Sequence, residues 1–201
     1  MTQFVSWISG DGLKRDYVDW KNISYNAKLA VVSSEDQLFP DHSGFDWKSI
    51  KKAVAYNKRK PNRIRGASTI SQQVAKNVFL WQSRGWIRKG LETYFTFMIE
   101  LVWGKKRILE VYLNVIEMGR GIYGIEAAAK NYFNKPSVNL TRAEAATIAA
   151  CLPSPKRYTV KPLSGYVAGR RNWVLQQMNN MEGDEDLQDI INKKVVTKEK
   201  K

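Results

Sequence analysis

Apolar side chains in this 201-residue chain recur every three or four positions, and this spacing constrains the fold more than any other feature. The pattern is clearest between residues 86 and 103, where the apolar positions are Leu91, Tyr94, Phe95, Met98, Leu101 and Val102. Residues at this spacing share one face of an α-helix, so we expect this stripe to face the core. The chain shows no convincing series of alternating apolar and polar residues, the pattern of a half-buried strand. The sequence therefore predicts an all-α or mainly α fold.

Side chains that can cap helices mark several of the expected starts. Asp46, Ser68 and Thr141 each precede a periodic segment, and their oxygens can accept from free backbone amides. Glu144 completes a capping box with Thr141. Helices are predicted after Asp46 and over residues 69–80, 86–103, 105–116, 125–133 and 166–181. Ile108, Leu109, Tyr112 and Leu113 are expected to point inward.

Length and composition are typical of one globular domain. Hydrophobic residues make up 43% of the chain, which disfavours disorder. The single cysteine excludes an internal disulfide and a multi-cysteine zinc site. No segment has the roughly 18 apolar residues needed to span a bilayer. We expect a domain over residues 1–182, followed by a charged C-terminal tail over 183–201, in which the acidic triplet Asp184–Asp186 is solvated.

The positive charge is concentrated in the middle of the chain. The net charge is +14, and residues 48–120, with 16 basic and 4 acidic side chains, carry +12 of it. Such a field attracts nucleic acid, anionic lipid headgroups or phosphorylated substrates. A solvated basic face without a partner explains the same charge, so these alternatives stay open.

Two adjacent carboxylates, Glu35 and Asp36, follow an apolar helical run over residues 27–32, and the only histidine, His42, comes shortly after. An acidic pair at a helix end often serves only as a solvated or capping feature. The position directly after an apolar helix also predicts partial burial. Burial would raise the pKa of Glu35 toward a value that suits a general base.

A second charged set is formed by Arg88, Lys89 and Glu92, which lie three and four positions apart and so share one helical face. An ordinary surface ion pair is one interpretation. Arginine and lysine beside a carboxylate could instead hold a pyrophosphate or position a metal.

The segment RGASTISQQ, residues 65–73, places Gly66, Ser68 and Thr69 at a predicted helix start. Free amides and hydroxyls at a helix N-terminus can bind an anion. The segment lacks the lysine spacing of a nucleotide P-loop, and simple capping would also explain it.

Taken in order, EDQLFPDHSGFDW, RGASTISQQVAKN, RKGLE and KKRILEVYLN resemble the signature of the peptidoglycan glycosyltransferases, the transglycosylase domain of penicillin-binding proteins. The resemblance covers about residues 24–178. Because no transpeptidase sequence follows, it implies a monofunctional member. It also implies a bilobal, lysozyme-like helical domain with a small membrane-proximal jaw and a juxtamembrane lead-in over residues 1–23.

The resemblance assigns roles to individual residues. It makes Glu35 the general base and Glu92 a second catalytic residue that would position cations, hold a divalent cation or assist departure of the leaving group. Asp36 and His42 would organise the loop around the base. The residues implied to bind substrate or pyrophosphate are Asp36, His42, Ser68, Thr69, Gln72, Gln73, Lys76, Asn77, Arg84, Arg88 and Lys89. Departures from the family pattern are small, such as Ala67 where the family usually has glycine.

The implied activity is polymerisation of lipid II into β-1,4-linked glycan strands, with inversion and release of undecaprenyl pyrophosphate. No cofactor is required by the sequence, although Mg²⁺ or Mn²⁺ at Glu92 is compatible with it. The implied partners are lipid II, the growing glycan strand, the membrane surface and other cell-wall synthesis proteins, without nucleic acid. The implied location is the periplasmic face of a bacterial inner membrane, with Trp47, Tyr56 and the KRKPNRIR loop in the jaw. The family's N-terminal transmembrane anchor is absent from this chain, as if removed or lying upstream of the start.

Two other classes of protein remain as alternatives. A lysozyme-like hydrolase would use a similar helical fold and one catalytic glutamate, but it would not need cations around Glu92. A basic helical nucleic-acid-binding protein would explain the charge but not the ordered carboxylate motifs.

Overall fold

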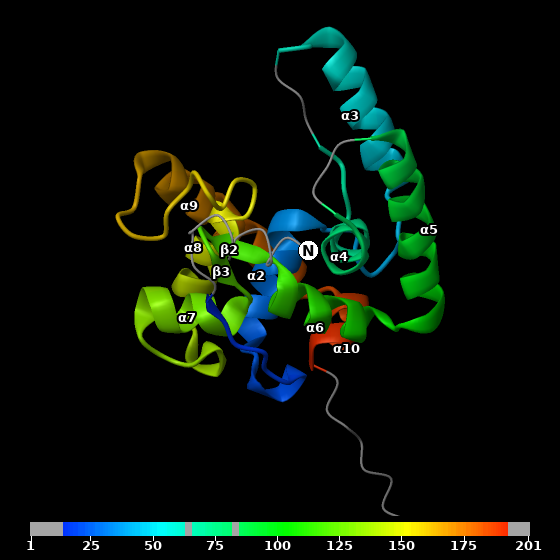
Figure 1. Ribbon diagram of the computed structural model, residues 1–201. Helices are drawn as coiled ribbons and strands as arrows, with labels where there is room; N and C mark the ends of the chain where they lie inside the picture. The colour runs from blue at the N-terminus through cyan, green and yellow to red at the C-terminus, as the bar shows by residue number, and fades with distance from the viewer. Residues whose placement is uncertain (1–13, 63–65, 82–84, 193–201) are drawn as a thin grey trace, which may run out of the picture.

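The computed structural model describes residues 14–62, 66–81 and 85–192 (Figure 1). The described part of the chain contains nine α-helices and one small sheet, which confirms the mainly α prediction. The helices are α2 (Tyr25–Glu35), α3 (Trp47–Arg59), α4 (Ile70–Phe79), α5 (Trp86–Val102), α6 (Lys105–Val115), α7 (Ile125–Phe133), α8 (Arg142–Cys151), α9 (Gly165–Met181) and α10 (Glu185–Asn192). Two short 3₁₀ helices are η1 (Trp20–Asn22) and η2 (Ser137–Asn139). None of the described helices combines the length and apolar composition needed to cross a membrane.

Helix α2 lies at the centre of the larger lobe. Residues 27–33 of α2 are all buried, and the helix packs against α8 and α9. Ser24 caps its first turn by accepting from the backbone amide of Ala27 across 3.0 Å. Because α2 is enclosed on all sides, its C-terminal end, at Glu35 and Asp36, is held in a fixed position.

The smaller lobe is an extended arm. Helices α3 and α5 project away from the other helices, with α4 near their base (Figure 1). Helix α4 packs against both α5 and α6, which joins the arm to the larger lobe. The two-lobed, helical outline expected from the family resemblance is therefore present.

The sheet ties the N-terminal segment to the larger lobe. Its strands are β1 (Lys14–Arg15), β2 (Glu117–Gly119) and β3 (Ile122–Tyr123), in the order β1-β3-β2. β1 runs parallel to β3, and β2 runs antiparallel to it with an irregular register. Gly124 ends this hairpin at φ +85°, and a Cβ there would lie 2.7 Å from the carbonyl oxygen of Asn114. Only glycine fits such a position without strain.

Most of the predicted helix limits are confirmed. The four expected inward residues of α6, Ile108, Leu109, Tyr112 and Leu113, are fully buried. Asp46 caps α3 by accepting from the amide of Ser49, and Thr141 forms the expected capping box with Glu144.

The predicted start of α4 was wrong by one residue. The N-cap is Thr69 in place of Ser68, and Thr69 forms a capping box with Gln72. Thr69 is preferred because its buried hydroxyl also donates to the carbonyl oxygen of Gly44 across 2.7 Å.

The predicted inward stripe of α5 was wrong in part. Leu101 and Val102 are 70% and 68% exposed, whereas the buried residues of the helix are Glu92, Thr96 and Ile99. Phe95 of the stripe is half-buried and stacks on Phe79 of α4, with ring centroids 4.7 Å apart. The side of α5 toward α4 therefore combines the charged cluster described below with part of the apolar stripe, and the C-terminal end of the stripe faces outward.

Part of the expected charged tail, residues 185–192, belongs to the folded domain, although Glu185 and Asp186 are exposed as expected. Residues 185–192 form α10, which packs on α2 and α6 with Leu187 and Ile191 buried. Asp184 caps this helix by accepting from the amide of Leu187.

Candidate active site

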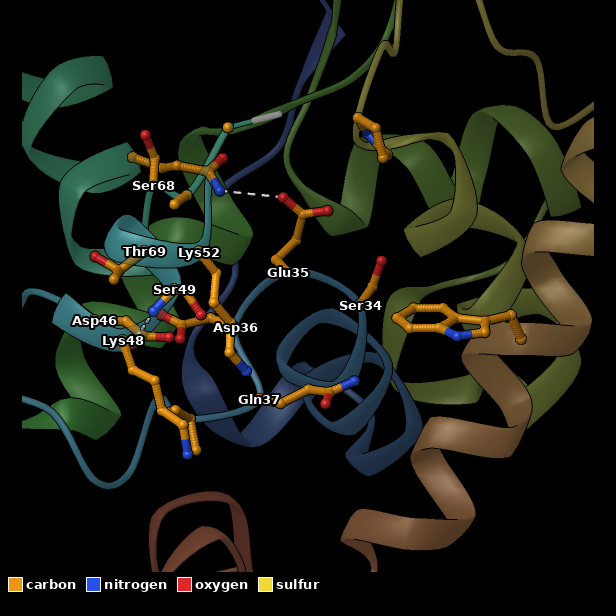
Figure 2. A pocket seen from close by; sticks show the side chains of 16 residues that line it. Ser34, Glu35, Asp36, Gln37, Asp46, Lys48, Ser49, Lys52, Ser68 and Thr69 are labelled. Carbon is orange, nitrogen blue, oxygen red and sulfur yellow. Dashed lines mark hydrogen bonds between the residues drawn. The ribbon is translucent and has the colours of Figure 1, made fainter. Parts of the chain in front are cut away.

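A cleft of about 690 Å³ lies between the C-terminal end of α2, the start of α3 and the segment before α4 (Figure 2). Helix α9 and the loop after α8 contribute the opposite wall, through Trp173 and Pro153. The predicted site residues that line the cleft are Glu35, Asp36, Ser68, Thr69 and Gln73. The structure thus brings the first two sequence motifs together in one concave site.

Glu35 is the last residue of α2, and its side chain points into the cleft (Figure 2). Burial raises the pKa of its carboxyl above the ordinary value. The adjacent Asp36 raises this pKa as well, while hydrogen bonding to Gln73 and the positive charge of Arg170 oppose the rise. A carboxylate whose pKa is raised in this way is a stronger proton acceptor than an exposed glutamate.

Gln73 connects Glu35 to the core. Its side-chain Nε2 donates to Oε2 of Glu35 across 3.1 Å. Its Oε1 accepts from the hydroxyl of Tyr112 across 3.3 Å, and Tyr112 is fully buried. Because the tyrosine hydroxyl occupies the amide oxygen, the amide nitrogen is the end that faces Glu35.

Asp36 is buried and joins three parts of the chain. Its carboxylate accepts from the backbone amide of Ile70 across 2.8 Å, at the N-terminus of α4. Both carboxylate oxygens also lie 3.0 Å from Nε2 of His42. The amide of Gly44 donates to Nδ1 of the same ring, so Nε2 carries the proton that is donated to Asp36. This network fixes the loop after Glu35 and places Asp36 and His42 beside the candidate base.

The second charged motif forms a separate cluster where α5 meets α4. Glu92 is 4% exposed, and Lys89 and Arg88 both donate to its carboxylate, Arg88 across 3.3 Å. Lys76 of α4 interacts electrostatically with all three residues. Burial lowers the pKa of Lys76, with a further decrease from Arg88 and Lys89 that Glu92 opposes. Three cations therefore share one carboxylate, which leaves a local excess of positive charge.

Helix α4 links the two groups of residues. Gln73 faces Glu35 and Lys76 belongs to the cluster around Glu92, one helical turn further along. Asn77 donates to the backbone carbonyl of Gln73 across 2.8 Å. Gln72 serves in the capping box. Arg84, which the sequence placed among the phosphate-binding cations, lies outside the described residues.

Sequence reasoning missed the contribution of α9. The Arg170 guanidinium stacks on the ring of Trp173 at 3.8 Å and donates to the carbonyl oxygen of Ser34 across 3.4 Å. Both residues lie about 135 positions after Glu35 in the chain, and no local sequence pattern connects their segment with Glu35. Lys48 and Lys52 of α3 also line the cleft, and only their basic character indicated a site.

The described residues contain no group of three or more histidine, cysteine, aspartate or glutamate side chains arranged to hold a metal ion. At Glu92, the carboxylate oxygens are occupied by Lys89 and Arg88. A divalent cation would have to displace both and approach three positive side chains, so this set of residues does not fit a resident metal.

Comparison with known proteins identifies the family. The family model described as transglycosylase matches residues 2–179. The chain is 53% identical over 189 residues to the biosynthetic peptidoglycan transglycosylases of Escherichia coli strain K12 / DH10B and Shigella boydii serotype 4, which covers 92% of this chain and 78% of each relative. These matches confirm the resemblance found in the four ordered motifs. The chain therefore belongs to the transglycosylase family.

Proposed function

We propose that this chain polymerises lipid II into β-1,4-linked glycan strands and releases undecaprenyl pyrophosphate, with Glu35 as the general base. Family membership and the two relatives make the chain a peptidoglycan glycosyltransferase. The observation that carries the finer proposal is the carboxyl of Glu35, which combines a cleft position, a raised pKa and a hydrogen bond that orients it.

The reaction requires the 4-hydroxyl of one sugar to attack the anomeric carbon of another. Glu35 would take the hydroxyl proton as the new C–O bond forms. The bond between the anomeric carbon and the pyrophosphate oxygen breaks, and the electron pair leaves with the pyrophosphate. Attack opposite the leaving group converts an α-linked donor into a β-linked product.

Asp36 and His42 position the base without touching the substrate. The carboxylate of Asp36 accepts hydrogen bonds from the amide of Ile70 and from His42, so we assign it no role in proton transfer. Its negative charge beside Glu35 raises the pKa of the base, which strengthens Glu35 as a proton acceptor.

The cations around Glu92 would stabilise the departing pyrophosphate. Lys76, Arg88 and Lys89 present more positive charge than the single carboxylate neutralises. A bound pyrophosphate would neutralise this excess positive charge. The charge-assisted hydrogen bonds from these cations would strengthen as negative charge develops on the departing pyrophosphate. Glu92 in this scheme orients the cations and does not hold a metal.

The arm formed by α3 and α5 would contact the periplasmic face of the bacterial inner membrane. Helix α3 has no buried residue. The two helices expose the large apolar side chains Trp47, Val54, Trp86, Ile87, Tyr94, Phe97, Leu101 and Val102. Lysines on α3 lie among them and suit anionic headgroups. A lipid-anchored substrate would then reach the cleft from the membrane surface.

The test is polymerisation of purified lipid II by the wild-type chain and by Glu35→Gln, with and without moenomycin, an inhibitor of the family. We expect a moenomycin-sensitive polymer from the wild type and a decrease in rate of at least about 100-fold in the variant. Near wild-type turnover by a folded Glu35→Gln would refute the base assignment. Release of fragments from purified cell wall, without extension of lipid II, would instead favour a hydrolase.

A further inference from the structure

A second hollow, of about 670 Å³, lies away from the cleft, between η1, α2, α6 and α10. It shares no lining residue with the cleft. Figure 1 shows α10 beside α6 at this end of the molecule. The charged and aromatic side chains that line the hollow are Asp19, Trp20, Lys21, Tyr25, Lys28, Lys106 and Glu110.

Lys28 is the unusual member of this set. It lies on the enclosed helix α2 and is only 5% exposed. Its ammonium lies 4.0 Å from the centroid of the Trp20 ring. Within the described part of the chain, this ammonium has no hydrogen bond and no ion pair, and it lines the hollow while the rest of the side chain is buried. A charge in such a partly enclosed position is stabilised when a partner is supplied.

A second ammonium lies beside the same aromatic ring. Nζ of Lys106 is 5.5 Å from the same Trp20 ring, and it also has no ion pair within the described residues. Burial, reinforced by the charge of Lys106, lowers the pKa of Lys28 to about 8, with Glu110 opposing the decrease. Two positive groups thus repel each other in a partly enclosed space.

Glu110, the carboxylate that interacts electrostatically with Lys28, is already engaged. Oε1 of Glu110 accepts from the backbone amide of Trp20 across 2.8 Å, and Oε2 accepts from Arg107 across 2.7 Å. Asp19 lines the hollow from its exposed rim. Neither residue forms a direct ion pair with Lys28 or Lys106 in the described structure, so the hollow retains unneutralised positive charge.

We propose that this hollow is a second anion site that binds a phosphate group between Lys28 and Lys106. A phosphate carries enough oxygen atoms to accept from both ammonium groups, and its charge removes their mutual repulsion. Trp20, Tyr25 and Ile191 provide an aromatic and apolar wall for an organic group attached to the phosphate. The phosphate could belong to a small soluble ester or to a lipid headgroup.

The site is separate from the proposed catalytic machinery. Lys28 precedes Glu35 by seven residues on α2, which places it about 10 Å away along the helix axis. The proposal does not depend on the reaction assigned to Glu35, and its failure would leave that assignment unchanged.

Two-dimensional NMR of the indole N–H groups tests the proposal, because Trp20 reports on this hollow and not on the cations around Glu92. The indole signal is assigned with a Trp20→Phe variant. Inorganic phosphate is then titrated at constant ionic strength, with chloride as the reference anion. We expect a saturable shift of the Trp20 signal with phosphate and none with chloride.

Two lysine variants and one control make the test specific. Lys28→Met preserves much of the buried stem, and Lys106→Gln changes a less buried position if the first variant folds poorly. Each should weaken phosphate binding by about tenfold or more, which corresponds to about 1.4 kcal/mol. Lys161→Gln makes the same change in charge at an exposed position between α8 and α9, outside the cleft, the arm and this hollow, and should leave binding unchanged.

A soluble short-chain phosphatidylglycerol, titrated below its micelle concentration, distinguishes the two sources. Tighter binding of this lipid than of inorganic phosphate would identify a headgroup site, whereas equal or weaker binding would identify a site for soluble phosphates. The absence of a saturable Trp20 shift with either probe would overturn the proposal. An undiminished shift in folded Lys28→Met and Lys106→Gln would do so as well.

Discussion

Nε2 of Gln73 donates a hydrogen bond to Oε2 of Glu35 across 3.1 Å, from the first turns of α4 to the last residue of α2. Helix α2 belongs to the larger lobe and α4 supports the arm, so this contact aligns the candidate base with the lobe that carries the cation cluster. The contact also lowers the pKa of Glu35, which burial would otherwise raise further.

Replacing Gln73 with leucine should shift the pH dependence of polymerisation. Without the amide donor, the pKa of Glu35 rises, and a general base acts only when it is deprotonated. The acidic limb of the rate profile should therefore move to higher pH, with the largest rate loss on the acidic side of the profile. Tyr112→Phe, which keeps the amide donor, should shift the limb less. An unchanged limb in Gln73→Leu would contradict the orientation proposed for this hydrogen bond.

Glu35→Gln should stabilise the chain while it abolishes activity. The pKa of Glu35 is higher in the folded chain than in the unfolded one. At pH values between these two pKa values, the folded chain therefore binds the proton more strongly than the unfolded chain does. The stability contributed by Glu35 therefore falls as the pH rises through this range, whereas glutamine stays neutral. Thermal unfolding should show a higher midpoint for the variant at pH 8 and a difference near zero at about pH 4. Glu182→Gln, at an exposed position, should show no such pH-dependent gain.

Glu92→Gln should disrupt the cation cluster. Loss of the shared carboxylate leaves Lys76, Arg88 and Lys89 with uncompensated repulsion, and it lowers the pKa of Lys76 further. We expect a decrease of about 100-fold in polymerisation rate and a loss of about 1–3 kcal/mol in the free energy of unfolding. Glu182→Gln removes a more exposed ion pair with Arg142 and should cost less than about 1 kcal/mol. Equal effects of the two changes would argue against a special role for the cluster.

The two capping boxes offer a matched comparison. Thr69 and Thr141 each cap a helix through the residue three positions later, but only Thr69 also donates to a distant backbone carbonyl, that of Gly44. Thr141→Val should destabilise the chain by about 1 kcal/mol, and Thr69→Val by about 2 kcal/mol. Urea unfolding measures both. If the costs were equal, the bond to Gly44 would contribute nothing to stability.

Exposed apolar residues on the arm should determine membrane binding. Trp86 and Ile87 are 93% and 78% exposed, and changing either to serine should weaken binding to phosphatidylglycerol vesicles by about tenfold. Val138→Ser, at an exposed position on η2, is the control and should have no effect. Vesicle co-sedimentation provides the measurement. Unchanged binding in both arm variants would place the membrane contact elsewhere.

Local patterns predicted those parts of the fold that depend on short-range chemistry. The inward face of α6 followed from its apolar spacing, and the caps at Asp46 and Thr141 followed from side chains that accept nearby amides. The α5 stripe misled because periodicity identifies an apolar face without indicating what covers it. In the folded chain, α5 meets α4 through Glu92 and Phe95, and Leu101 and Val102 at the end of the stripe face outward.

The sequence by itself determined the mainly α class, the family and the identity of the candidate base, because these depend on residue types in a fixed order and spacing. Only the tertiary structure decided that Gln73 orients Glu35, that Arg170 and Trp173 of α9 reach the cleft, and that α10 completes a second hollow around Lys28. These relationships join segments far apart in the chain. They arise from how helices pack against one another, which no local spacing specifies.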